Sequence, residues 1–314
     1  MDSSRSPAPF PVIALMGPTA VGKTSIAIRL ARRIGAEIVN VDSVQIYRRL
    51  DIGSAKPTIE ERQMVPHHLV DILEPDEPMD AARFSRLARR VVRRLMEGGR
   101  NVILAGGTGL YMRAILQGIS PVPGRHPGLR QSFMEAADRF GTPWLHARLK
   151  EVDQEAASRI SENDLYRIMR ALEIFYETGM AMSRWIQRNR PIPLHEELGR
   201  PVLKIGLMIP RRELYARIDQ RVDQMLEEGF VEEVEGLLAA GYSPDLRPLQ
   251  SIGYRHIIGF LLGGMTLEEA VRELKRDTRR FAKRQLTWFR SEPGIEWFDA
   301  RGLRREKDLW DALH

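Results

Sequence analysis

The chain has 314 residues, of which 43% are hydrophobic, and its formal net charge is +6 at pH 7. It contains no cysteine, which excludes disulfides, thiolate zinc sites and a cysteine nucleophile. No stretch approaches the roughly 20 apolar residues of a membrane span, and the start of the chain lacks the pattern of a secretion signal. We therefore expect a cytoplasmic protein with no membrane partner. The excess of lysine and arginine over aspartate and glutamate favours a polyanionic partner.

A phosphate-binding motif lies near the start of the chain, directly after the apolar run at 12–15. It has the P-loop pattern of a glycine, four residues and then Gly-Lys-Thr. Its glycines let backbone N–H groups face inward, and the following helix presents its positive N-terminal end. Lys23 adds a charge for the terminal phosphate, and the Thr24 hydroxyl is placed to ligate Mg²⁺. The sequence therefore predicts a polyphosphate site formed by Gly17, Pro18, Thr19, Ala20, Val21, Gly22, Lys23 and Thr24.

Short strands and helices alternate after this motif. The apolar spacing of residues 25–34 predicts a helix, and the β-rich run at 37–41 predicts a second strand. Such alternation is typical of an α/β fold, a P-loop-type parallel sheet with helices on both faces. Ligands of these sheets bind beyond the carboxyl ends of the strands. Asp42 follows one such end, and it lies beside the P-loop if the two strands are neighbours.

Further segments extend this core. Residues 54–80 are rich in proline and polar residues and are predicted mostly as loop. Asp80 is predicted to cap a helix that runs to about Met96. A third strand at 101–105 leads into the glycine-rich turn at 106–111, which we expect to form a wall of the same crevice.

The pattern changes between residues 119 and 201, where proline, glycine and basic residues interrupt helical segments. We therefore predict a helical insertion at 119–201 within a P-loop catalytic core formed by 1–118 and 202–314. The best helix of the insertion runs from Asn163 to Thr178, and the sheet resumes with a strand at 202–209.

Two helices in the last third of the chain carry basic residues. The helix predicted at 213–228 holds Arg217 and Arg221, four residues apart. The last long helix, from Thr266 to about Phe289, interleaves arginine and lysine with aromatic residues. Basic side chains neutralise phosphates and aromatic ones stack bases, so this helical C-terminal region predicts nucleic-acid contact.

With these motifs in this order, the chain resembles the bacterial tRNA dimethylallyltransferases, also called tRNA isopentenyltransferases. The likeness runs nearly from end to end. Besides the P-loop it rests on the stretches Val41–Arg48, Asp51–Pro57, Pro66–Asp71, Gly106–Tyr111, Asn163–Glu173, Ile252–Arg255 and Lys283–Arg290. Val21 stands where the family commonly has serine, and Glu162 where proline is common. Neither departure removes a group that the chemistry needs.

The resemblance implies transfer of a dimethylallyl group from dimethylallyl diphosphate to N6 of an adenine in the tRNA anticodon loop. That adenine is adenosine 37, on the 3′ side of the anticodon, in tRNAs that read codons beginning with U. The product is N6-(dimethylallyl)adenosine. The P-loop would hold the diphosphate, with Mg²⁺ bound to Thr24. Either Arg217 or Arg221 would also bind the diphosphate, and the spacing of the two residues does not show which. The implied catalytic residues are Asp42, Thr19, Lys23 and Arg217.

Asp42 is the candidate base in this scheme. N6 of adenine is a poor nucleophile because its lone pair is delocalised into the ring, so a base helps in the transition state. A magnesium ligand and a structural cap are the alternative roles for this carboxylate.

The resemblance also implies a set of tRNA contacts, in which the insertion and the C-terminal helices clamp the anticodon stem. An adenine in a stacked loop has to leave its stack to reach a buried electrophile. Arginine and lysine suit phosphates, glutamine and threonine suit base edges, and tyrosine and tryptophan suit stacking. The expected contacts are Asp42, Ser43, Val44, Gln45, Thr108, Arg130, Tyr166, Arg167, Ile168, Met169, Arg170, Gln250, Ser251, Ile252, Gly253, Tyr254, Arg255, Lys283, Arg284, Gln285, Leu286, Thr287, Trp288, Phe289 and Arg290.

Three other functions share parts of this pattern. A P-loop kinase of nucleotides or small metabolites would turn over ATP without tRNA. A nucleotide-regulated RNA-binding protein would lose little on Asp42→Asn, whereas an enzyme would lose most of its turnover. An enzyme that prenylates free adenine nucleotides has less need of the insertion and the basic helix. The sequence does not encode the oligomeric state, for which a monomer is the default.

Overall fold

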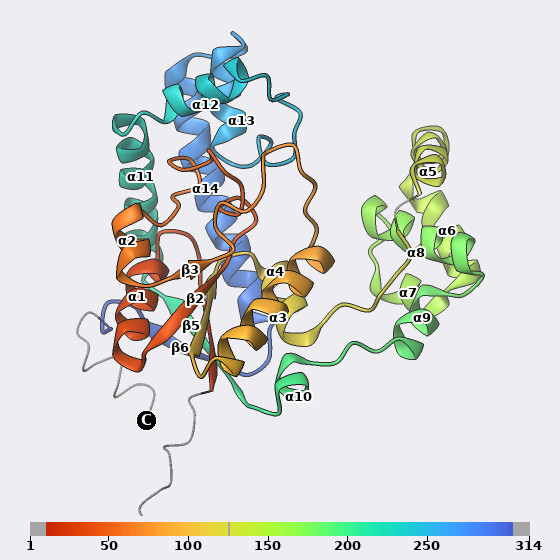
Figure 1. Ribbon diagram of the computed structural model, residues 1–314. Helices are drawn as coiled ribbons and strands as arrows, with labels where there is room; N and C mark the ends of the chain where they lie inside the picture. Colours follow the sequence, from red (N-terminus) through yellow and green to blue (C-terminus); the bar gives the residue numbers. More distant parts are fainter. Residues whose placement is uncertain (1–10, 125, 304–314) are drawn as a thin grey trace, which may run out of the picture. The chain divides into compact units, whose positions relative to one another are not determined.

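The computed structural model describes residues 11–124 and 126–303, and its centre is a parallel six-stranded sheet (Figure 1). The strand order is β3-β2-β4-β1-β5-β6, and every neighbouring pair is parallel. This arrangement confirms the predicted α/β fold class. The strands are β1 (Val12–Met16), β2 (Ala36–Val41), β3 (His67–His68), β4 (Asn101–Gly106), β5 (Val202–Met208) and β6 (Ile295–Asp299).

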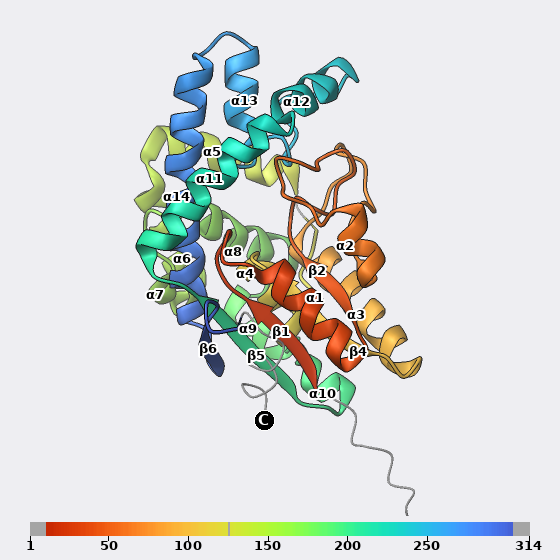
Figure 2. The same cartoon turned by 90° about the vertical axis from the view of Figure 1, so that its left-hand side faces the viewer.

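Helices cover both faces of this sheet (Figures 1 and 2). One hydrophobic cluster joins a sheet face to α1 and α11, through Ile26 and Ile218 among others. The other cluster joins the opposite face to α3, α4 and α13, through Phe84 and Ile257 among others. The helices of this part are α1 (Lys23–Ile34), α2 (Ile59–Met64), α3 (Ala81–Glu97), α4 (Gly109–Gln117), α10 (Leu194–Leu198), α11 (Arg211–Glu227), α12 (Phe230–Ala239), α13 (Tyr254–Leu261) and α14 (Leu267–Arg290).

The chain divides into two compact units, and the smaller one, Gln117–Ile192, is built from helices. Its core contains Leu149, Ile168 and Leu172, all at most 1% exposed. The predicted insertion ended at 201, but residues after Ile192 belong to the larger unit, because Leu194 of α10 packs into the core around the sheet. The helices of the smaller unit are α5 (Pro127–Phe140), α6 (Thr142–Val152), α7 (Gln154–Arg159), α8 (Leu165–Thr178) and α9 (Met182–Arg188).

Three elements were not expected from the sequence. The segment 54–80 contains α2 and the two-residue strand β3, although most of it is loop as predicted. A capping box between Thr58 and Glu61 starts α2, and the spacing of these two residues is a signal that sequence inspection could have used. The edge strand β6 also went unpredicted, since its sequence Ile-Glu-Trp-Phe-Asp is short and half polar. Within the described residues, no helix is long and apolar enough to cross a membrane.

Candidate active site

The P-loop connects β1 to α1 with the left-handed backbone that its curl requires. Gly22 is the N-cap of α1 at φ 102°, and Ala20 adopts φ 61°. Lys23 Nζ donates hydrogen bonds to the carbonyls of Gly17, at 3.0 Å, and Pro18, at 2.7 Å. The ammonium group is thereby folded over the loop whose N–H groups form the anion nest.

Lys23 is electrostatically linked to two other polar groups. Burial lowers the pKa of Lys23 to about 8, the Asp42 carboxylate opposes this shift, and the Arg221 guanidinium adds to it. Burial also lowers the pKa of Arg221, again against the Asp42 carboxylate. The two cations and the one carboxylate therefore face a common region at the carboxyl edge of the sheet.

Asp42 reaches this region from a strand that does not adjoin β1. The strand β4 separates β2 from β1, so the two strands are not neighbours as the simplest prediction required. Asp42 Oδ1 accepts hydrogen bonds from the backbone N–H of Val44, at 2.8 Å, and of Gln45, at 3.3 Å. These two bonds fix the orientation of the carboxylate at the strand end.

A cavity of about 1220 Å³ connects these groups within the larger unit. The P-loop, residues 42–45 and residues 106–108 line it from the edge of the sheet, and residues 51–59 line it from the loop that follows β2. Helices α11, α13 and α14 contribute arginines, namely Arg217, Arg221, Arg255 and Arg284. Its volume exceeds the roughly 300–1,000 Å³ of typical small-ligand pockets.

The structure distinguishes the two candidate arginines of α11. Arg221 Nη1 donates to Thr19 Oγ1 at 3.3 Å and so reaches the P-loop itself. Arg217 lines the cavity too, but its Nη2 is paired with Glu213 at 2.7 Å. Arg221 is therefore the better placed partner for an anion on the P-loop, and Arg217 is the outer of the two.

Gln285 of α14 lines the cavity and binds the P-loop. Its Oε1 accepts the Thr19 N–H at 2.9 Å, and its Nε2 donates to the Gly107 carbonyl at 2.8 Å. The side chain is 7% exposed, and a Cβ on Gly107 would lie 2.5 Å from Nε2, so a larger residue at 107 would displace this amide. Both polar ends of this side chain bind backbone, and its expected contact with RNA stays a prediction.

Four other expected tRNA contacts lie in hydrophobic cores. Tyr254 and Phe289 pack in the cluster around the sheet at no more than 1% exposure. In the smaller unit, Ile168 is fully buried and Met169 is 7% exposed. Each of these four side chains is packed away from solvent, and the expected tRNA contacts at these positions stay predictions. The side chains at these four motif positions stabilise the fold.

Two expected contacts of the smaller unit form an ion-pair cluster. Glu173 is fully buried, and its oxygens bind Arg130 Nε at 3.0 Å and Arg170 Nη1 at 2.6 Å. The His126 N–H also donates to Glu173 Oε1, at 2.7 Å. These arginines lower the pKa of Glu173 against the opposing effect of burial, the largest contribution. Arg130 and Arg170 therefore support the packing of the unit.

Apart from Gly253, which is buried, the remaining expected contacts are exposed or partly exposed. Thr108 lies beside the end of β2, where its Oγ1 accepts the Ser43 N–H at 3.2 Å. The Arg113 guanidinium lies 4.2 Å from the centroid of the partly buried Trp288 ring. The side chains with at least some exposed surface are Ser43, Val44, Gln45, Thr108, Tyr166, Arg167, Gln250, Ser251, Ile252, Arg255, Lys283, Arg284, Leu286, Thr287, Trp288 and Arg290.

The fold and this site define an α/β protein of the P-loop type, in which a carboxylate and arginines face a polyphosphate nest across one cavity. The sequence model described as IPP transferase matches residues 45–292. A tRNA dimethylallyltransferase of Syntrophobacter fumaroxidans is 49% identical over 318 residues, which cover 99% of this chain and 92% of the relative.

Two solved structures are also similar. The tRNA isopentenylpyrophosphate transferase of Bacillus halodurans has a TM-score of 0.68 at 38% identity, covering 96% of this chain and 98% of that one. A eukaryotic dimethylallyltransferase acting on tRNA has a TM-score of 0.78 at 26% identity, covering 92% of this chain and 73% of that one. The chain belongs to the IPP transferase family, that of the tRNA dimethylallyltransferases. The resemblance stated from the motifs is thereby confirmed.

Proposed function

We propose that the chain transfers the dimethylallyl group of dimethylallyl diphosphate to N6 of adenosine 37 in tRNA, giving N6-(dimethylallyl)adenosine. Membership of the family supports the type of reaction. The observation that carries the assignment of the site is the shared cavity of the P-loop and Asp42, together with the electrostatic link between Asp42 and Lys23. A phosphate nest facing a carboxylate suits a reaction with an anionic leaving group and a proton to remove.

The donor diphosphate binds at the P-loop in this proposal. Lys23 and Arg221 stabilise the negative charge that develops on the diphosphate as its carbon–oxygen bond breaks, and Arg217 adds a more distant charge. The Thr24 hydroxyl lines the cavity and fits Mg²⁺, which typically takes one or two protein groups together with phosphate oxygens and water. When bound there, Mg²⁺ supplies further charge stabilisation to the leaving group.

The acceptor adenine enters the cavity from the tRNA after leaving its stack. Its N6 forms a bond to the carbon that the diphosphate leaves, and the N6 proton passes to the Asp42 carboxylate. The N–H groups of Val44 and Gln45 hold this carboxylate at the end of β2. Thr108, two residues after β4, lies beside Ser43, and in this proposal it binds the same base.

The anticodon stem-loop binds the exposed basic residues of each unit in this proposal. Lys283, Arg284 and Arg290 are exposed on α14, and Arg167 is exposed on α8. They supply sequence-independent phosphate contacts, and the exposed Tyr166 supplies a stacking surface. We further propose that the protein acts as a monomer in the cytoplasm.

The assignment of Asp42 is tested with Asp42→Asn, compared with Asp76→Asn, an exposed carboxylate in the loop after β3. Asp42→Asn is expected to lower single-turnover transfer by about a hundredfold or more, while the Kd values of donor and tRNA stay close to wild type. Asp76→Asn is expected to transfer at the wild-type rate. An Asp42→Asn protein that keeps wild-type turnover would show that another group removes the proton.

A further inference from the structure

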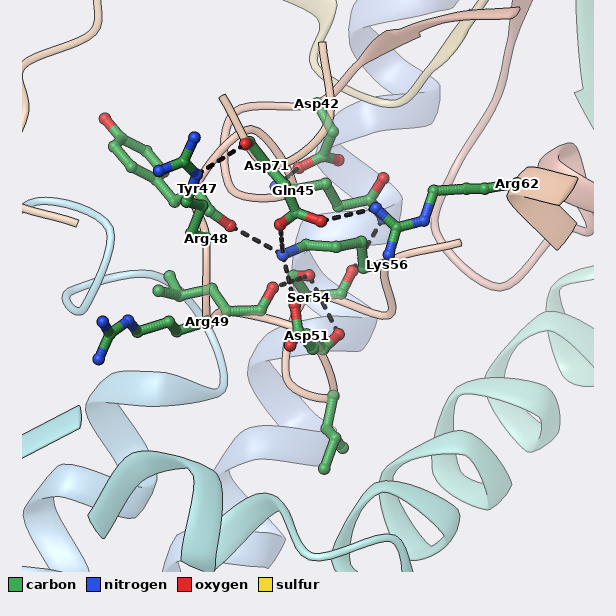
Figure 3. A network of polar contacts seen from close by, with 12 residues as sticks. Asp42, Gln45, Tyr47, Arg48, Arg49, Asp51, Ser54, Lys56, Arg62 and Asp71 are labelled. Atoms are coloured by element: carbon green, nitrogen blue, oxygen red, sulfur yellow. Dashed lines mark hydrogen bonds and ion pairs between the residues drawn. The ribbon is translucent and has the colours of Figure 1, made fainter. Parts of the chain in front are cut away.

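A buried lysine, Lys56, lies in the loop 51–59 that lines the cavity together with Asp42, and the transfer reaction as described does not use it. The Lys56 side chain is 2% exposed. Its Nζ binds Asp51 Oδ1 and Asp71 Oδ1, both at 2.5 Å, and donates to the Tyr47 carbonyl at 2.8 Å (Figure 3). Asp71 in turn binds Arg62 Nη1 at 2.6 Å through its other oxygen. A buried ammonium requires such partners, so all three of its protons are in use.

Gln45 connects this cluster to the candidate base. Its backbone N–H donates to Asp42 Oδ1 at 3.3 Å, and its Nε2 donates to the carbonyls of Ser54, at 3.0 Å, and Ala55, at 2.9 Å (Figure 3). The Asp71 N–H donates to the Gln45 carbonyl, also at 3.3 Å. Gln45 is therefore bound on one side to Asp42 and on the other to the residues that surround Lys56.

The backbone around Lys56 adopts conformations that need external support. Ala55 and Asp71 have φ values of 49° and 55°, and Leu69 and Arg49 have values of 61° and 65°. Left-handed backbone at residues other than glycine persists only where surrounding contacts hold it. Lys56 adjoins Ala55 in the chain and binds the Asp71 carboxylate directly. The ammonium group is thus the common contact of the two segments that hold Gln45.

The same loop is held from its outer side by α12. The carboxylate of Glu233 accepts the backbone N–H groups of Asp51, Ile52 and Gly53 at 3.0, 2.6 and 3.2 Å. This second anchor fixes residues 51–53 and forms no hydrogen bond with Gln45. The hydrogen bonds of Gln45 run instead to Ser54 and Ala55, which directly precede Lys56 in the chain.

We propose that Lys56 is a positioning residue, which fixes the direction of the Asp42 carboxylate toward the acceptor through Gln45. The proposal rests on the role of Asp42 as base in the proposed function. A lysine that only stabilised the fold would lower transfer whether or not Asp42 were present. A lysine that acts through Asp42 affects transfer only while the carboxylate is there.

The test is a double-mutant cycle with Lys56→Met and Asp42→Asn, read out by single-turnover transfer and by the Kd of dimethylallyl diphosphate. Lys56→Met is expected to slow transfer by about tenfold or more, with a donor Kd close to wild type and partial rescue in Lys56→Arg. In the Asp42→Asn background, Lys56→Met is expected to cause no further loss. Lys204→Met, which removes an ammonium bond to the Pro293 carbonyl elsewhere, is the matched control and keeps the wild-type rate.

Multiplicative losses in the double variant, or wild-type transfer by a folded Lys56→Met protein, would overturn the proposal. If Lys56→Met does not fold, Gln45→Leu decides by the same cycle, because it breaks the bonds to Ser54 and Ala55 and leaves the ammonium paired. Failure of the proposed function is a separate outcome, since the wild-type protein would then transfer no label at all.

Discussion

Removal of the Gln285 side chain is expected to destabilise the larger unit and to loosen the donor site together. Gln285→Ala leaves the Thr19 N–H and the Gly107 carbonyl without the partners that they have at 2.9 and 2.8 Å. An unsatisfied buried backbone group costs about 1–3 kcal/mol. Water that enters from the cavity recovers part of this cost, so we expect a loss of about 2–4 kcal/mol in the free energy of unfolding.

The assay is urea unfolding of the variant, combined with calorimetric titration of dimethylallyl diphosphate. The donor Kd is expected to rise, because Thr19 belongs to the loop that binds the diphosphate. Gln285→Glu keeps an acceptor for the Thr19 N–H but places a carboxylate against the Gly107 carbonyl and near the leaving group, so its donor Kd rises further. Gln63→Ala, on the exposed surface of α2, is the control and changes stability by about 0.5 kcal/mol or less. If Gln285→Ala resembles this control in both measurements, the structural role is refuted.

Three further predictions concern charge. Burial lowers the pKa of Lys23 to about 8, so its ammonium group is lost above that pH in the free protein. The Kd of dimethylallyl diphosphate should therefore rise above pH 8, approaching about tenfold per pH unit. A Kd of the wild type that does not change with pH, or the same rise in Lys23→Arg, would contradict this prediction. Glu173→Ala should destabilise the smaller unit by about 3–5 kcal/mol, because two arginines lose a buried partner. Limited proteolysis measures this loss, with Glu177→Ala, at an exposed position, as the control. Equal resistance of the two variants to proteolysis would contradict the prediction. Replacing Lys283 and Arg284 by alanine should reduce the salt slope of tRNA binding by about 1 for each lost phosphate contact, and an unchanged slope would place the RNA elsewhere.

Local signals in the sequence predicted the parts of the fold that depend on neighbouring residues. The P-loop, the strands around it and the cap at Asp80 follow from spacing and residue type within a few positions. Asp42 was placed at a strand end for the same reason, although β4 separates its strand from β1. The α/β class follows from this alternation alone.

Roles that depend on distant contacts could not be predicted in this way. Gln285 and Thr19 are 266 positions apart, and nothing near either residue indicates their hydrogen bond. Tyr254 and Phe289 belong to motifs shared with an RNA-modifying family, yet the motif does not show whether a side chain packs in the core or faces RNA. The spacing of Arg217 and Arg221 likewise did not indicate which of them reaches the P-loop, whereas the hydrogen bond from Arg221 to Thr19 does. A motif identifies residues that matter, and the packing determines what they do.

The most direct test of the account incubates the purified protein with Mg²⁺, radiolabelled dimethylallyl diphosphate and unmodified tRNA whose anticodon is followed by adenines. The same tRNA with guanine at position 37 is the matched control. The account predicts label on the adenine tRNA, label-free guanine tRNA and N6-(dimethylallyl)adenosine after digestion. Folded protein that transfers label to neither tRNA, or equally to both, would contradict the assignment of donor, acceptor and site.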